Sequence, residues 1–104
     1  MASRFFVYNE RLGISIPKNT IDWEGVSTVE QQQILFLWEE NRGKIPDRIK
    51  EIEMEINRKQ TLLDEEDDFP NSCIINSEIA DLASSINELW LWYRFEPSLS
   101  VPLK

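Results

Sequence analysis

The clearest pattern of apolar and polar positions lies in the middle of the chain. Five apolar residues recur there at spacings of four, three, four and seven: Ile45, Ile49, Ile52, Ile56 and Leu63. This spacing places them on one face of an α-helix, and most of the remaining positions are charged. Pro46 suits a first helical turn, where its missing N–H costs nothing. The pattern predicts an amphipathic helix that begins at Pro46 and ends near Leu63 or Asp64.

Another helix is predicted before this one. Ser27 and Glu30 have the spacing of a capping box, in which the two side chains satisfy free backbone amides of a first turn. The helix is expected to begin near Ser27 and to continue through Trp38. Gly43 is expected to end it in the left-handed conformation that is common just after helices.

The third predicted helix lies near the end of the chain. Its main apolar stripe consists of Ile75, Ile79, Leu82, Ile86, Leu89 and Tyr93. The helix is expected to begin at Ser72 or Asn76 and to end at Arg94, with residues 69–72 forming part of the preceding loop. Two prolines, Pro97 and Pro102, argue against helix in the tail at 96–104.

The N-terminal part of the chain favours extended structure. Two β-prone runs, Phe5 to Tyr8 and Ile14 to Ile16, flank a connection that ends in Gly13, which suits a β-hairpin. An isolated hairpin is marginal in water, so this one would have to lie on the helices. We therefore expect a single, mainly α domain over 1–104. It comprises an extended segment or β-hairpin over 1–26, a three-helix bundle-like part over 27–95 and a non-helical tail over 96–104.

Two of the predicted helices have more apolar surface than one buried face can hold. Residues 34–38 and 89–93 are uninterrupted apolar runs, and each covers more than a full turn. The N-terminal segment, a second copy of the chain or another protein could cover this surface. Aromatic residues are enriched at the centres of protein interfaces. The candidate interaction residues are Phe36, Trp38, Trp90, Trp92 and Phe95.

The charge distribution changes which partners are plausible. The formal net charge is −8, and the whole surplus lies in residues 27–104. Acidic surfaces repel phosphate backbones, so direct binding to nucleic acid or to an anionic membrane is not expected. The apolar run from Phe5 to Tyr8 is too short for a secretory signal, and one cysteine, Cys73, allows no internal disulfide. These features predict a cytoplasmic protein.

Candidate catalytic chemistry is sparse. The chain has no histidine, which removes the commonest general base and metal ligand. Its three glycines are isolated, so no glycine-rich phosphate loop is present. Cys73 could act as a nucleophile only beside a cation or a helix N-terminus. Its interpretation as a small buried hydrophobe is favoured over that role. We expect no enzyme activity, cofactor, metal or small-molecule ligand.

A run of five carboxylates separates the last two predicted helices: Asp64, Glu65, Glu66, Asp67 and Asp68. Calcium loops need oxygen ligands at alternating positions and a glycine at the tight turn, which contiguous acids do not supply. A solvated loop is the favoured interpretation. The alternative is a docking element for a basic partner.

These observations lead to one favoured function and two alternatives. The favoured one is a small, acidic, non-catalytic interaction domain that self-associates, as a homodimer, through its aromatic helix faces. The first alternative is an acidic regulator that docks on a basic protein through the loop at 64–68. The less favoured alternative is an enzyme that uses carboxylates or Cys73. No motif indicates a particular family, and in size and general composition the chain is similar to short bacterial proteins.

Overall fold

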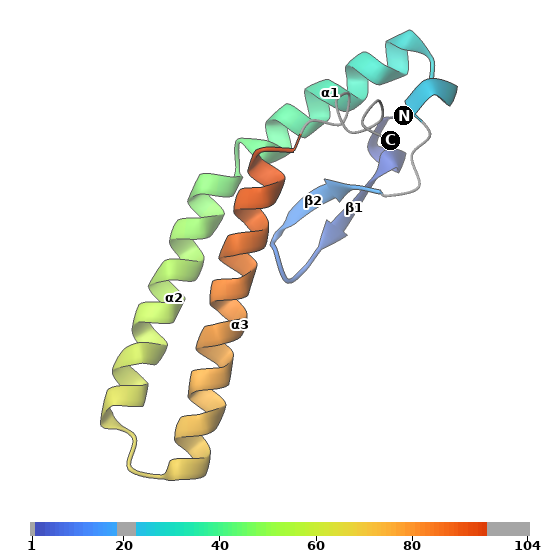
Figure 1. The fold of residues 1–104 in the computed structure, drawn as a ribbon. Coiled ribbons are helices and arrows are strands. Elements are labelled where there is room, and N and C mark those ends of the chain that lie inside the picture. The colour runs from blue at the N-terminus through green and yellow to red at the C-terminus, as the bar shows by residue number, and fades with distance from the viewer. Residues whose placement is uncertain (1, 19–22, 96–104) are drawn as a thin grey trace.

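A computed structural model describes the backbone of residues 2–18 and 23–95. In this part of the chain it contains three α-helices, one two-stranded antiparallel sheet and two short 3-10 turns, Ala2–Phe5 and Trp23–Gly25 (Figure 1). The expected class, mainly α with an N-terminal β-hairpin, is confirmed. The tail expected at 96–104 lies outside the described residues.

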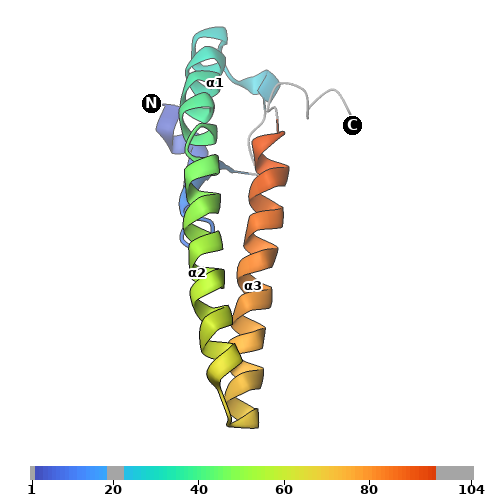
Figure 2. The ribbon, with the colours of Figure 1, turned by 90° about the vertical axis from the view of Figure 1, so that its left-hand side faces the viewer.

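The molecule is organised around two long antiparallel helices. Helix α2 (Ile45–Glu65) and helix α3 (Phe69–Tyr93) lie side by side and are joined by three residues (Figures 1 and 2). The apolar stripe of α2 faces α3, as its spacing predicts, with Ile45, Ile49 and Ile52 buried. Lys59 lies on the same stripe, and its ammonium group contacts Glu55 and Glu78 instead of entering the core.

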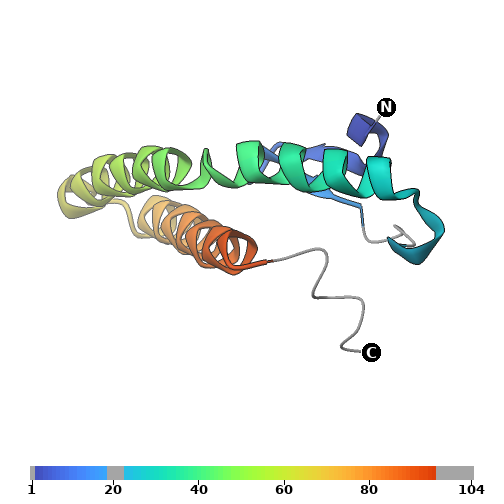
Figure 3. The same ribbon diagram turned by 90° about the horizontal axis from the view of Figure 1, so that it is seen from above.

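Helix α1 (Thr28–Arg42) does not complete a side-by-side bundle. It bends away from the axis of α2 at their junction (Figure 1) and extends past the end of α3 (Figures 2 and 3). Ser27 caps it as predicted, accepting a hydrogen bond from the Glu30 amide at 3.1 Å. Gly43 is the C-cap of α1, as predicted, but its φ of −64° is right-handed and not left-handed. Residues 43–44 separate the two helices, and Pro46 in the first turn of α2 lacks the N–H that would continue the helical hydrogen-bond ladder.

Helix α3 begins earlier than the sequence analysis predicts. Asp68 is its N-cap, and the Asp68 carboxylate accepts a hydrogen bond from the Asn71 amide at 3.1 Å. Pro70 therefore lies in a first turn, where it is tolerated. Residues 69–72 are helical rather than part of a loop. The connection between α2 and α3 consequently shrinks to residues 66–68.

The β-hairpin matches its prediction closely. Strand β1 (Phe6–Asn9) pairs with strand β2 (Ile14–Pro17), with Asn9 opposite Ile14. The Asn9 side chain accepts a hydrogen bond from the Leu12 amide at 2.9 Å and holds the turn. Gly13 has a φ of +77°, which favours glycine, and a Cβ there would collide with the Arg48 side chain.

The tip of this hairpin supplies the centre of the main core. Leu12 is fully buried against residues of both long helices. The other buried members of this cluster are Ile14, Ile45, Ile49, Ile52 and Leu89. The hairpin thus covers one side of the helix pair near its junction with α1, which the sequence left open as one of three possibilities.

Candidate functional site

A compact aromatic cluster fills the junction of α1, α3 and the hairpin. Trp38 lies at its centre, only 1% exposed, with ring centroids 6.5 Å from Phe6, 5.8 Å from Trp92 and 6.1 Å from Phe95. Its indole N–H donates a hydrogen bond to the Phe95 carbonyl at 3.0 Å. Aromatic edges packed on faces in this way stabilise a core beyond their buried area. The cluster anchors α1 to the end of α3.

The five candidate interaction residues therefore divide into two groups. Trp38, Trp92 and Phe95 contact one another inside this chain, and Trp38 is a core residue rather than an exposed one. Phe36 is 64% exposed on the side of α1 away from Trp38, and Trp90 is 39% exposed on α3. The aromatic runs thus supply core material as well as surface, because each run covers a whole helical turn.

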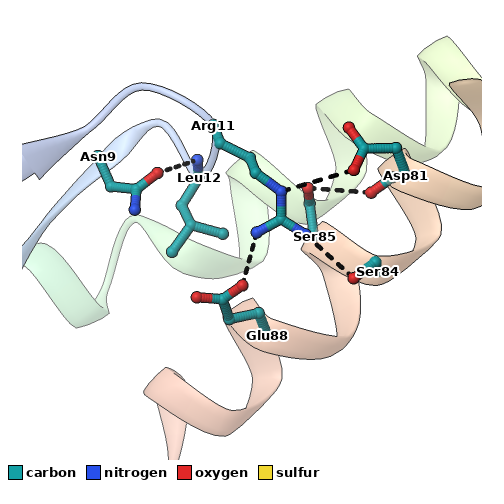
Figure 4. A network of polar contacts seen from close by, with 7 residues as sticks. All are labelled: Asn9, Arg11, Leu12, Asp81, Ser84, Ser85 and Glu88. Carbon is teal, nitrogen blue, oxygen red and sulfur yellow. Dashed lines mark hydrogen bonds and ion pairs between the residues drawn. The ribbon is translucent and has the colours of Figure 1, made fainter.

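One side of α3 is occupied by the tip of the hairpin. The Arg11 guanidinium contacts Glu88 at 2.5 Å, Ser84 at 3.0 Å and Asp81 at 3.8 Å (Figure 4). These three partners are spaced three and four residues apart, so they share one helix face. Arg48 of α2 donates a hydrogen bond to the Leu12 carbonyl at 2.9 Å. Two arginines thereby hold the hairpin tip on the helix pair.

The charged residues of α3 are all on or beside this side. The helix contains three acids and no basic residue, namely Glu78, Asp81 and Glu88. Glu78 pairs with Lys59 at 3.0 Å, and the other two pair with Arg11. Every charge of α3 is therefore matched within the chain, and the rest of the helix surface carries none.

The opposite side of α3 is uncharged and apolar. Five residues at spacings of four, three, four and three form what we call the α3 stripe: Ile79, Ala83, Ile86, Trp90 and Tyr93. At 3.6 residues per turn this stripe faces away from the side that binds Arg11. Trp90 and Tyr93 are 39% and 37% exposed and pack edge-to-face, with ring centroids 5.6 Å apart.

The sequence predicts only part of this stripe. Ile79, Ile86 and Tyr93 belong to the main apolar stripe predicted for this helix, and in the structure Ile79 and Ile86 are half-buried while Tyr93 is exposed. Ala83 and Trp90 widen the apolar surface beyond the seam with α2, and Ala83 is exposed. The signal was present in the sequence, because positions 83 and 90 repeat at seven residues next to the main stripe.

The acidic run has local structural roles. Asp64 and Glu65 belong to the last turn of α2, whereas Asp68 caps α3. The Glu66 carboxylate accepts hydrogen bonds from the Asp68 amide at 3.1 Å and from the Asn71 side chain at 2.7 Å. In residues 2–18 and 23–95, no three His, Cys, Asp or Glu side chains are grouped so that they could hold a metal ion.

Cys73 differs from its favoured interpretation. It is exposed on the second turn of α3, not buried. The correction has a simple cause, because α3 begins at Phe69 and the seam residue Ile75 lies two positions further on. Two positions correspond to about 200° around a helix, so Cys73 points away from the core.

None of the helices in the described part of the chain is both long and apolar enough to cross a bilayer.

Comparison with known proteins adds no relative to this picture. No protein-family model matches the chain, and neither a curated protein nor a solved structure matches it.

Proposed function

We propose that this protein is a non-catalytic interaction domain that binds a second copy of itself through the α3 stripe. The observation that carries the proposal is an uncharged, half-exposed aromatic surface on a chain whose formal net charge is −8. Of the five aromatic residues predicted to interact, Trp90 is the one that lies on this surface. The exposed free thiol of Cys73 fits a reducing, cytoplasmic setting.

The energetic argument rests on the two rings at the end of the stripe. Trp and Tyr are enriched in the contact centres of interfaces because each buries a large apolar area at a small entropy cost. Trp90 and Tyr93 already fix each other edge-to-face, so little further ordering is required on binding. Neighbouring Ile79 and Ile86 are half-buried and extend the apolar surface along the helix.

Replacing Trp90 tests this proposal, and Phe36 offers a matched control. Both are exposed aromatic residues on helices, but only Trp90 lies on the α3 stripe. We expect Trp90→Glu to convert a wild-type dimer into a monomer, as measured by light scattering after size exclusion. Phe36→Glu should remain dimeric, and circular dichroism should show unchanged helicity for both variants. A dimer that survives Trp90→Glu, or dissociates only with Phe36→Glu, would show that another surface makes the contact.

The acidic turn between α2 and α3 favours a second candidate function, docking on a basic protein. Asp64, Glu65 and Asp67 are exposed at the far end of the helix pair from the aromatic cluster. None of these three pairs with a basic side chain in residues 2–18 and 23–95. Contacts between exposed charges weaken as salt rises, whereas apolar contacts do not. Association with a polylysine probe that persists at 1 M salt would contradict this candidate.

A further inference from the structure

We infer that two copies of the chain pair through antiparallel α3 helices, with a twofold axis beside Ile86 and Trp90 seated over Ala83 of the partner subunit. This inference rests on the proposed function and specifies its geometry. It follows from three properties of the α3 stripe: its charge, the order of residue sizes along it, and its place opposite the hairpin.

The charge of the α3 stripe is compatible with a second copy as the occupant. An acidic chain that binds itself must avoid placing its carboxylates against each other, because like charges at an interface are costly. All three acids of α3 lie on or beside the opposite side and are paired with Arg11 or Lys59. The stripe therefore contacts its own copy without repulsion. A charged group that lies against the stripe, the Arg42 guanidinium 5.8 Å from the centroid of the Tyr93 ring, is paired with Glu39.

The order of residue sizes selects the antiparallel direction. Ile79 and Tyr93 lie seven residues before and after Ile86, while Ala83 and Trp90 lie three before and four after. An antiparallel pair centred on Ile86 thus brings the largest side chain, Trp90, opposite the smallest, Ala83, on each side of the axis. Knobs-into-holes packing favours such a combination of large and small residues.

A parallel pair would not bring the large residues of the stripe opposite the small ones. It would place Trp90 against Trp90 of the partner subunit and Ala83 against Ala83 of the partner subunit. The first layer would be crowded and the second would contain a gap, and both are unfavourable in a packed interface. The order of residue sizes is thus self-complementary only in the antiparallel direction, and an antiparallel pair can close as a twofold dimer.

The position of the stripe leaves the rest of the fold undisturbed. The hairpin is held on the opposite side of α3 by Arg11, so it stays on the outside of the dimer. Ile86 of α3 and Ile56 of α2 are both half-buried and pack on the core. Two copies would thus join their α2–α3 pairs into a four-helix arrangement, in which the open edge of each seam is closed.

An exchange of the large and small residues tests the register. Ala83→Trp places a second indole opposite Trp90 and should weaken dimerisation about tenfold to a hundredfold. Trp90→Ala removes the ring and should weaken it about tenfold. The double variant Ala83→Trp/Trp90→Ala restores one large and one small residue per layer. Its dissociation constant should return to within about threefold of the wild-type value, measured by sedimentation equilibrium.

Ala80→Trp is the matched control for this exchange. Ala80 is also an exposed alanine of α3, but it lies about 60° around the helix from Ala83, outside the stripe. Ala80→Trp should leave the dissociation constant of the dimer unchanged. If the wild type is a dimer and the double variant is no tighter than the single variants, the register is wrong while self-association stands. If the wild type is a monomer at every concentration, self-association itself fails.

Cross-linking gives an independent measurement of the geometry. In the inferred dimer the two Cys73 residues lie 13 positions from the axis on opposite sides, or about 39 Å apart along the helices. A short bis-maleimide should therefore not join two wild-type chains, but it should join chains of Ile86→Cys/Cys73→Ser. If the wild type is a dimer and the chains of Ile86→Cys/Cys73→Ser do not cross-link, the inference is overturned.

Discussion

The two sides of α3 are covered in opposite ways. The side that carries Asp81, Ser84 and Glu88 is covered by the hairpin tip, through Arg11. The α3 stripe, which is uncharged and includes Trp90 and Tyr93, is half-exposed. The hairpin also buries the apolar core around Leu12 and Leu89. Burial of apolar area is the main favourable term in folding, and the α3 stripe is apolar surface that this packing leaves half-exposed. In our proposal a second copy of the chain covers it.

The largest expected difference between the two sides is in stability. Leu12→Ala removes a fully buried side chain beneath the hairpin, and we expect a loss of about 2–5 kcal/mol in the free energy of unfolding. Trp90→Ala, measured below the dimer dissociation constant, should cost less than about 1 kcal/mol because the ring is partly exposed. Urea unfolding at low protein concentration checks both values. Equal losses in the free energy of unfolding for Leu12→Ala and Trp90→Ala would contradict the distinction between the covered side and the α3 stripe.

A substitution in the turn of the hairpin should cause the second largest loss in the free energy of unfolding. Gly13→Ala forces a non-glycine residue into a φ of +77° and brings a Cβ against the Arg48 side chain. We expect a loss of about 1–2 kcal/mol, chiefly from the left-handed backbone. The dimer dissociation constant should not change, because the hairpin lies away from the α3 stripe. A variant that unfolds at the wild-type urea midpoint would contradict the role of this turn.

The polar contacts on the covered side should contribute less. Arg11→Gln removes the contacts with Asp81 and Glu88, which are about 40% or more exposed. Exposed ion pairs are worth little and are screened by salt, so we expect a loss of about 0.5–1 kcal/mol at low salt. That loss should shrink in 1 M NaCl. A loss that is independent of salt would mean that packing of the Arg11 stem, not its charge, holds the hairpin.

The smallest effect is expected at an exposed pair outside both sides. The hydrogen bond from Arg58 lowers the pKa of Glu55 below its ordinary 4.5, and the Glu55 and Arg58 side chains are 39% and 59% exposed. Because the folded pKa is the lower one, the pair stabilises the fold above pH 4.5. The stabilisation is lost as the pH falls through the lowered value. Wild type should therefore melt slightly above Glu55→Gln at pH 7, and the two should converge near pH 3.

Local patterns predicted the elements of this fold more successfully than their ends. The stripe from Ile45 to Leu63 and the hairpin around Gly13 depend on periodicity and turn chemistry within a few residues, and both are confirmed. The start of α3 was missed because Pro70 was interpreted as a loop residue. The preceding Asp68, a good N-cap, makes it a first-turn proline. Cys73 is exposed because it lies two positions, or about 200° around the helix, before the buried Ile75.

The candidate surface was harder to predict, because it depends on which elements meet. Nothing in the run from Leu89 to Tyr93 shows that Trp92 contacts Trp38 while Trp90 stays half-exposed. That division follows from α1 extending past the end of α3, and no local pattern specifies this. The exclusion of charge from one side of α3 could have been read from the sequence, since its three acids share the other half of the helix.

The most direct test of the account is the molar mass of the wild-type protein in solution, measured by light scattering in 1 M NaCl over a range of concentrations. Burial of the uncharged α3 stripe between two copies predicts a mass that rises with concentration to twice 12.3 kDa and resists salt. A mass of 12.3 kDa at every concentration would contradict the account. The half-exposed α3 stripe would then not bind a second copy of the chain.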